Sequence, residues 1–211
     1  MFDTTTIYAV IAAGVLAVPA GWVAFIIVKR ESDAGRHLFL ALMIASVAVA
    51  IWAALVIPPT WLLLAALMLG WTLCMLSAID LLTFRLPDIL TLPLLVAGLL
   101  LCFWLPDHNP LGHAVGAAAG FLILYAIAAV YCRIRSREGL GLGDAKLAGA
   151  AGAWLGWQAL PSVLLIACVF ALTWTGASVV RHGRAAAAER IAFGLPLCGA
   201  FWLVWLYGPP L

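Results

Sequence analysis

The chain has 211 residues, of which 66% are hydrophobic and 9% charged, its formal net charge is +2, and its mean hydropathy is +1.16. A soluble globular domain needs far more polar surface than this to face water, so the composition excludes that class and predicts an all-α polytopic membrane protein. The small net charge gives no indication of a nucleic-acid partner, and the expected surroundings are a lipid bilayer.

In chain order, eight apolar runs separated by polar or proline-containing breaks are each expected to form one transmembrane helix. Together they predict a single membrane-embedded domain over residues 1–211. The sixth run is short, because its stretch Leu147–Trp157 at ~1.5 Å per residue falls short of a ~30 Å hydrocarbon core and must tilt, borrow from its flanks or lie in a thinned bilayer. The expected runs are 6–28, 38–57, 61–79, 89–105, 112–132, 145–160, 162–180 and 191–207.

The loops between these runs differ in charge. All eleven Lys and Arg residues lie in or beside the odd-numbered loops, whereas the even-numbered loops around Pro58–Pro59, Pro106–Asp107 and Trp157–Pro161 contain none. Because positively charged loops stay in the cytoplasm, we expect the odd loops inside and both chain termini outside. The basic residues are Lys29, Arg30, Arg36, Arg85, Arg133, Arg135, Arg137, Lys146, Arg181, Arg184 and Arg190.

Three carboxylates, Asp80, Asp88 and Asp144, lie at cytoplasmic membrane borders, where desolvation is costly and each needs a reason. Asp88 follows Pro87 and precedes an apolar run, which indicates a structural helix cap. Asp80 ends the third run, and the negative end of a helix dipole disfavours a carboxylate there. A purely structural role therefore does not account well for a carboxylate at Asp80.

The pattern Gly-x-Gly-Asp at Gly141–Asp144 stands at the start of the sixth run. A cap at the helix N-terminus explains Asp144 alone about as well as catalysis does. It does not explain Gly141 and Gly143, because glycine is needed where another backbone approaches closely, as a peptide substrate would. Gly141, Gly143 and Lys146 are therefore expected to shape this turn or to bind substrate.

Small residues recur at every fourth position in the fifth and sixth runs. Such spacing lets helix backbones approach closely within a membrane. We therefore expect the two helices to pack tightly and to hold the Gly-x-Gly-Asp turn in place. The residues are Gly112, Gly116 and Gly120 in the fifth run, and Ala148, Gly152 and Gly156 in the sixth.

If the helices bring Asp80 and Asp144 together, the two form a carboxylate dyad in which one side chain keeps a proton and the other acts as a base. The base would activate water to attack a peptide carbonyl, which makes an aspartic endopeptidase the leading hypothesis. The alternative is a small transporter or proton pathway that binds ions at the same two residues. Their position at a border, away from the bilayer midplane, argues against that alternative.

Two segments carry a family resemblance. "AIDLLTFRLPDILTLPLLVAGLL" (Ala78–Leu100) and "REGLGLGDAKLAGAAGAWLGWQALP" (Arg137–Pro161) resemble the signature regions of the type IV prepilin peptidases, here 75–100 and 137–161. These are intramembrane aspartyl proteases with eight spans. The resemblance implies that Asp80 and Asp144 are catalytic, and that the leader of type IV prepilins or type II secretion pseudopilins is cleaved at the cytoplasmic face of the bacterial inner membrane. The presence of both aspartates argues against an inactive relative that only binds precursors.

One departure from the family concerns the first loop. Many bacterial members carry there a large domain with two C-x-x-C pairs that bind zinc, and they methylate the new N-terminus with S-adenosylmethionine. Here the loop is only Lys29–His37 and has no cysteine, and none of the chain's five cysteines forms such a pair. We therefore expect no metal, no cofactor and no methyltransferase activity.

The charge distribution generates a test of topology. In a chain freed of its native cysteines, single cysteines placed at Arg85 and Arg137 should be labelled from the cytoplasmic side, and one at Pro59 from outside. Membrane-impermeant thiol reagents applied to oriented vesicles measure this. Labelling of positions 85 and 137 from opposite faces would contradict the dyad, because the two aspartates could not meet.

Overall fold

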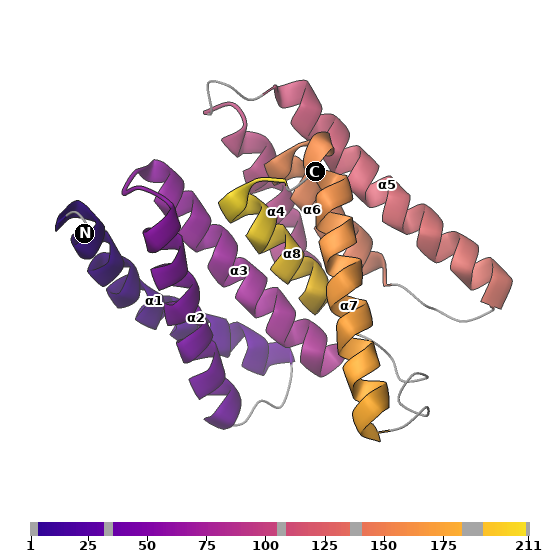
Figure 1. Cartoon of the computed structure of the whole chain (residues 1–211), viewed down its shortest axis with the longest axis horizontal. Coiled ribbons are helices and arrows are strands. Elements are labelled where there is room, and N and C mark those ends of the chain that lie inside the picture. Colours follow the sequence, from indigo (N-terminus) through magenta and orange to yellow (C-terminus); the bar gives the residue numbers. More distant parts are fainter. Residues whose placement is uncertain (1–3, 32–35, 105–108, 136–140, 183–191, 210–211) are drawn as a thin grey trace. The chain divides into compact units, whose positions relative to one another are not determined.

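A computed structural model describes residues 4–31, 36–104, 109–135, 141–182 and 192–209 of the chain (Figure 1). The described part folds into eight α-helices and one short 3₁₀-helix, which confirms the all-α class. Each expected apolar run overlaps one α-helix in particular, although the sixth run, 145–160, extends beyond α6 over the 3₁₀-helix to the first residue of α7. The elements are α1 Thr4–Glu31, α2 Arg36–Val56, α3 Trp61–Thr83, α4 Asp88–Leu101, α5 Pro110–Arg135, α6 Leu142–Leu155, η1 Trp157–Ala159, α7 Leu160–His182 and α8 Gly194–Tyr207.

Some sequence predictions concern positions outside these residues. They include the middle of the loop Lys29–His37, the outer loop at Pro106–Asp107, and residues 137–140 of the second signature region. The chain divides into two compact units, residues 1–83 and 84–211, and each is described by itself. The expectation of a single domain over 1–211 stays a prediction.

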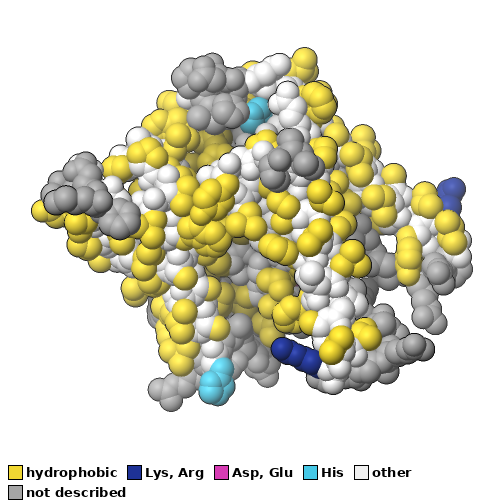
Figure 2. Space-filling model, viewed as in Figure 1, with side chains coloured by type: hydrophobic (Ala, Val, Ile, Leu, Met, Phe, Trp, Pro, Cys, Tyr) yellow, Lys and Arg dark blue, Asp and Glu magenta, His cyan; other side chains and the backbone are white. Residues whose placement is uncertain are grey.

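Four helices among the described residues are long and apolar enough to cross a membrane: α2 from Phe39, α3, α5 to Ile134, and the stretch Trp157–Arg181 that includes α7. Shorter apolar helices accompany them in α1, α4 and α8. Large hydrophobic side chains are exposed along these helices, for example Ile44, Leu122 and Leu172, and Figure 2 shows hydrophobic atoms over most of the face in view. Such a surface is suited to lipid rather than to water.

The first unit consists of α1, α2 and α3, which pack against one another. Gly21 of α1 faces α2, where an added Cβ would lie 2.6 Å from the Met43 Cε atom. Trp71 of α3 donates its indole N–H to the Ser46 carbonyl oxygen of α2 at 3.3 Å. A close approach made possible by glycine and one hydrogen bond from a buried indole therefore connect the three helices.

The second unit is built around α6, which packs against α4, α5, α7 and α8. The small residues of α5 and α6 meet as predicted: a Cβ on Gly116 would lie 2.5 Å from the Gly152 carbonyl oxygen, and a Cβ on Gly120 would collide with Ala148. On its other side, α6 contacts α4, because Trp154 donates its indole N–H to the Leu94 carbonyl oxygen at 2.7 Å. The helix that carries Asp144 is therefore enclosed by its neighbours.

Three helices of this unit are short. The helices α4, α6 and α8 have 14 residues each, or about 21 Å, against a hydrocarbon core of about 30 Å. For α6 the end comes at Gly156, whose φ of +79° is readily adopted only by glycine. The shortness expected of the sixth run is confirmed, and two neighbours of α6 share it.

Candidate functional site

Asp144 occupies the first turn of α6 and is buried. Its carboxylate oxygen Oδ2 accepts a hydrogen bond from the Gly141 N–H at 3.2 Å, and its own N–H donates to the Gly141 carbonyl oxygen, also at 3.2 Å. Asp144 is thus the third residue of the helix, and its side chain reaches back to cap the N–H of the residue that precedes the helix. The free N–H groups and the positive end of the helix dipole favour its charged form.

Gly141 and Gly143 both belong to this turn, but their backbone surroundings differ. Gly141 precedes the helix in an extended conformation, with φ −76° and ψ 148°, which any residue can adopt. Gly143 lies against the loop before α4, where an added Cβ would be 2.7 Å from the Leu86 Cβ atom. The close neighbour of Gly143 is therefore the chain's own Leu86, whereas the sequence suggested a substrate backbone.

The structure differs from the cap that the sequence predicts at Asp88. The cap position of α4 is Pro87, which makes no side-chain cap hydrogen bond, and Asp88 is the first helical residue. Its carboxylate oxygen Oδ1 instead accepts a hydrogen bond from the Lys146 ammonium at 2.5 Å. The reason is tertiary, because Lys146 comes from α6, 58 positions further along the chain. Asp88 still benefits from the positive end of the α4 dipole.

Asp80 lies in the first unit, in the last turn of α3, and its side chain is buried. The helix ends at Thr83, and the next residue, Phe84, has a positive φ of 53°, which is uncommon for a bulky side chain. The helix that carries Asp80 therefore ends within one turn of the acidic residue. The two aspartates belong to different units, and their pairing is part of the function proposed below.

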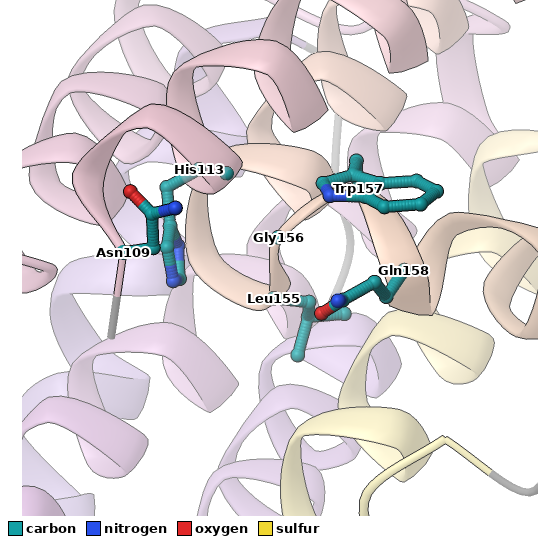
Figure 3. A pocket seen from close by; sticks show the side chains of 7 residues that line it. Asn109, His113, Leu155, Gly156, Trp157 and Gln158 are labelled. Carbon is teal, nitrogen blue, oxygen red and sulfur yellow. The ribbon is translucent and has the colours of Figure 1, made fainter. Parts of the chain in front are cut away.

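A cavity of about 340 Å³ lies at the opposite end of α6, about 17 Å along the helix from Asp144. Figure 3 shows Asn109 and His113 on one side of it, and Trp157 and Gln158 on the other. His113 is buried and hydrogen-bonds through Nδ1 to the Ala153 carbonyl oxygen at 2.8 Å. His113 was not among the residues predicted from the sequence, although its position between Gly112 and Gly116 of the glycine stripe was a visible signal.

The side chains that could ligate a metal ion are dispersed in the described part of the chain. No group of three His, Cys, Asp or Glu residues comes close enough there to hold an ion. The cysteines Cys74, Cys102, Cys132, Cys168 and Cys198 are free thiols spread over four helices and the turn after α4. The expectation that the protein needs no metal stays a prediction, because it concerns the whole chain.

The observations together define a helical membrane protein whose two signature segments each carry a buried carboxylate near a helix end. Residues 67–176, which include both carboxylates, match the type IV leader peptidase family. The chain belongs to this family, as the resemblance predicted, and is a multi-pass membrane protein.

Named relatives share much of the chain. A prepilin leader peptidase/N-methyltransferase of Aeromonas salmonicida (strain A449) is 42% identical over 181 residues, which cover 85% of this chain and 60% of the relative. The protein of the same name from Aeromonas hydrophila is 43% identical over 175 residues, or 82% and 59% of the two chains. The protein of the same name from Klebsiella pneumoniae is 51% identical over 106 residues, which cover 50% of this chain and 46% of the relative. The chain spans about 60% of the length of the Aeromonas relatives, and no solved structure matches it.

The contact at Gly143 leads to a stability prediction. Gly143→Ala should lower the free energy of unfolding by about 1–3 kcal/mol, because the new Cβ overlaps Leu86. The matched variant Gly141→Ala should change it little, because its Cβ would come no closer than 3.5 Å to the Asp144 Oδ2 atom. Thermal unfolding in detergent measures both. In a Leu86→Gly background the effect of Gly143→Ala should shrink, and an undiminished effect would place the clash elsewhere.

Proposed function

We propose that the protein is an intramembrane aspartic endopeptidase that removes the leader peptide from type IV prepilins or type II secretion pseudopilins. Asp80 and Asp144 are its catalytic pair. The observation that carries this proposal is the placement of two buried carboxylates in the two signature segments of a leader peptidase family. The names of the Aeromonas relatives support the same activity.

The ends of the helices support a division of labour within the pair. Asp144 lies where N–H groups and the positive end of the α6 dipole favour a carboxylate, so it is the base. Asp80 lies in the last turn of α3, where the negative end of the dipole disfavours a second charge, so it keeps the shared proton. The pair titrates jointly, and the assignment describes its dominant protonation state.

Peptide hydrolysis by such a pair needs no metal. The ionised carboxylate takes a proton from water, the water oxygen attacks the scissile carbonyl, and the protonated carboxyl gives its proton to the carbonyl oxygen. Collapse of the tetrahedral intermediate then breaks the C–N bond, and the leaving amine receives a proton from the dyad. Burial of both side chains supports this chemistry, because a dry site strengthens each electrostatic interaction with the developing charge.

The direction of the substrate follows from the charge distribution. With all eleven basic residues in or beside the odd loops, eight spans would put Asp80 and Asp144 on the cytoplasmic side and both termini outside. A precursor with a short basic leader keeps that leader in the cytoplasm while its apolar helix enters the bilayer. Cleavage at the border between the two fits a multi-pass enzyme of the bacterial inner membrane.

Methylation of the new N-terminus is not part of the proposed activity. The loop Lys29–His37 is short and has no cysteine, so it offers neither a zinc-stabilised subdomain nor much folded surface for a large polar methyl donor. The N-methyltransferase in the relatives' names refers to proteins of which this chain spans about 60%.

Replacement of either aspartate should abolish processing. Asp80→Asn and Asp144→Asn each remove a group that transfers the proton, so the cleavage rate should fall by about 10³-fold or more with the protein still inserted. Asp88→Asn should lower the cleavage rate far less, because the Asn side chain retains an oxygen that can accept the hydrogen bond from Lys146. Cleavage of a prepilin panel by purified variants in lipid vesicles measures this. Substantial cleavage by either dyad variant would exclude the pair.

The product should carry a free N-terminal amine. Mass spectrometry of pilin processed in vesicles that contain only this enzyme and S-adenosylmethionine measures it, and chelators should leave the cleavage rate unchanged. A methylated product that depends on the added donor would show that the donor binds elsewhere in the chain and would contradict the interpretation of the short loop.

A further inference from the structure

We propose that the Asp88–Lys146 ion pair is a positioning element that sets the direction of the Asp144 carboxylate. This inference rests on the proposed peptidase function, in which Asp144 is the base. It assigns Lys146 to the enzyme's own structure, although the sequence left open whether Lys146 binds substrate. All the contacts involved lie within the second unit.

Two contacts join the first turns of α6 to the same short segment, Leu86–Asp88. Gly143 lies against Leu86, so closely that an added Cβ would be 2.7 Å from the Leu86 Cβ atom. Lys146 holds Asp88 at 2.5 Å between Nζ and Oδ1. Residues three positions apart lie on the same side of a helix, so one side of α6 is attached at both points.

Asp144 lies between these two attachment points in the sequence but projects from a different side of the helix. Successive residues are about 100° apart around the axis, so the carboxylate leaves the turn away from the Leu86–Asp88 segment. A carboxylate about 5 Å from the axis moves about 1 Å for each 10° by which the turn rotates. An error of that size at a reacting group is enough to slow a reaction about 10²-fold.

The solvent exposure of the ion pair indicates that it contributes more to the orientation of the α6 turn than to the stability of the fold. The Lys146 side chain is 29% exposed and that of Asp88 is 56% exposed. Ion pairs this open to solvent contribute little to folding, because water and salt screen them. The same pair still restricts rotation, because the Asp88 backbone is held in α4, and α4 is connected to α6 again by the Trp154 hydrogen bond to Leu94. Loss of the ion pair should therefore leave the bundle folded and free only the turn.

The test is a kinetic comparison of variants in lipid vesicles with a prepilin that the unmodified enzyme cleaves. Asp88→Ala and Lys146→Met should each lower kcat by about 10- to 100-fold, with KM within about threefold of the unmodified value. Lys146→Arg, which keeps the charge and the donor, should stay within about threefold in kcat. Arg133→Met is the matched control, since it removes an exposed charge from α5 away from this segment, and its kcat should not change.

The partnership of the two residues is tested by combining substitutions. The double variant Asp88→Ala/Lys146→Met should be no slower than the slower single variant. The exchange Asp88→Lys/Lys146→Asp should have a kcat at least about tenfold above that of the slower single variant. Additive losses in the double variant would overturn the proposal. A loss confined to KM would overturn it as well, because it would make Lys146 a substrate-binding residue.

A structural measurement separates this proposal from the activity on which it rests. Amide hydrogen exchange over residues 141–147 should be faster in Asp88→Ala and Lys146→Met than in Arg133→Met, with exchange in α7 unchanged. If the unmodified protein cleaves no prepilin, the peptidase function fails while the exchange data still report on the pairing. Unchanged exchange together with unchanged kcat in an active enzyme would overturn the positioning role alone.

Discussion

The desolvation of one carboxylate is the constraint on which the second unit depends. Asp144 is buried in an apolar bundle, where a charge without partners would be very costly. The helix N-terminus offsets this cost, because the Gly141 N–H donates to the carboxylate and the positive end of the α6 dipole favours its charge. That compensation works only if the start of α6 lies inside the bundle, so the surrounding helices must allow α6 to pack closely on every side.

The small residues of α6 meet this requirement. Its contacts with α5 bring backbone against backbone at Gly116 and Gly152, and larger side chains there would push the Asp144 turn out of position. Because α6 is about 21 Å long, a bilayer of ordinary thickness covers more than its own length. If α6 crosses the bilayer, as the sequence predicts, either one of its two polar ends, the Asp144 turn or the cavity at His113, is recessed below the membrane surface or the bilayer is thinned around it.

The two aspartates occupy opposite kinds of helix end, and this asymmetry organises the proposed chemistry. A symmetrical pair would have no intrinsic preference for which carboxyl keeps the shared proton. In the proposed pair, the placement of Asp80 in the last turn of α3 and of Asp144 in the first turn of α6 would create that preference through the backbone dipoles. Side-chain contacts are then available for another task, which is to set the geometry of the turn, as the ion pair of Asp88 and Lys146 does in our proposal.

The amino-acid sequence was enough to predict the helical membrane class, the eight helices of the described residues, the shortness of the sixth and the family, because apolar runs, their breaks and the Gly-x-Gly-Asp pattern are local features. The small residues at every fourth position of the fifth and sixth runs also predicted that these two helices pack together. The contacts of individual polar residues became visible only in the folded structure. Asp88 looked like a cap because its neighbours in sequence are Pro87 and an apolar run, whereas its partner Lys146 is 58 positions away. Gly143 faces Leu86, and His113 faces a cavity, for the same reason: these contacts join segments distant in sequence, and no local pattern records them.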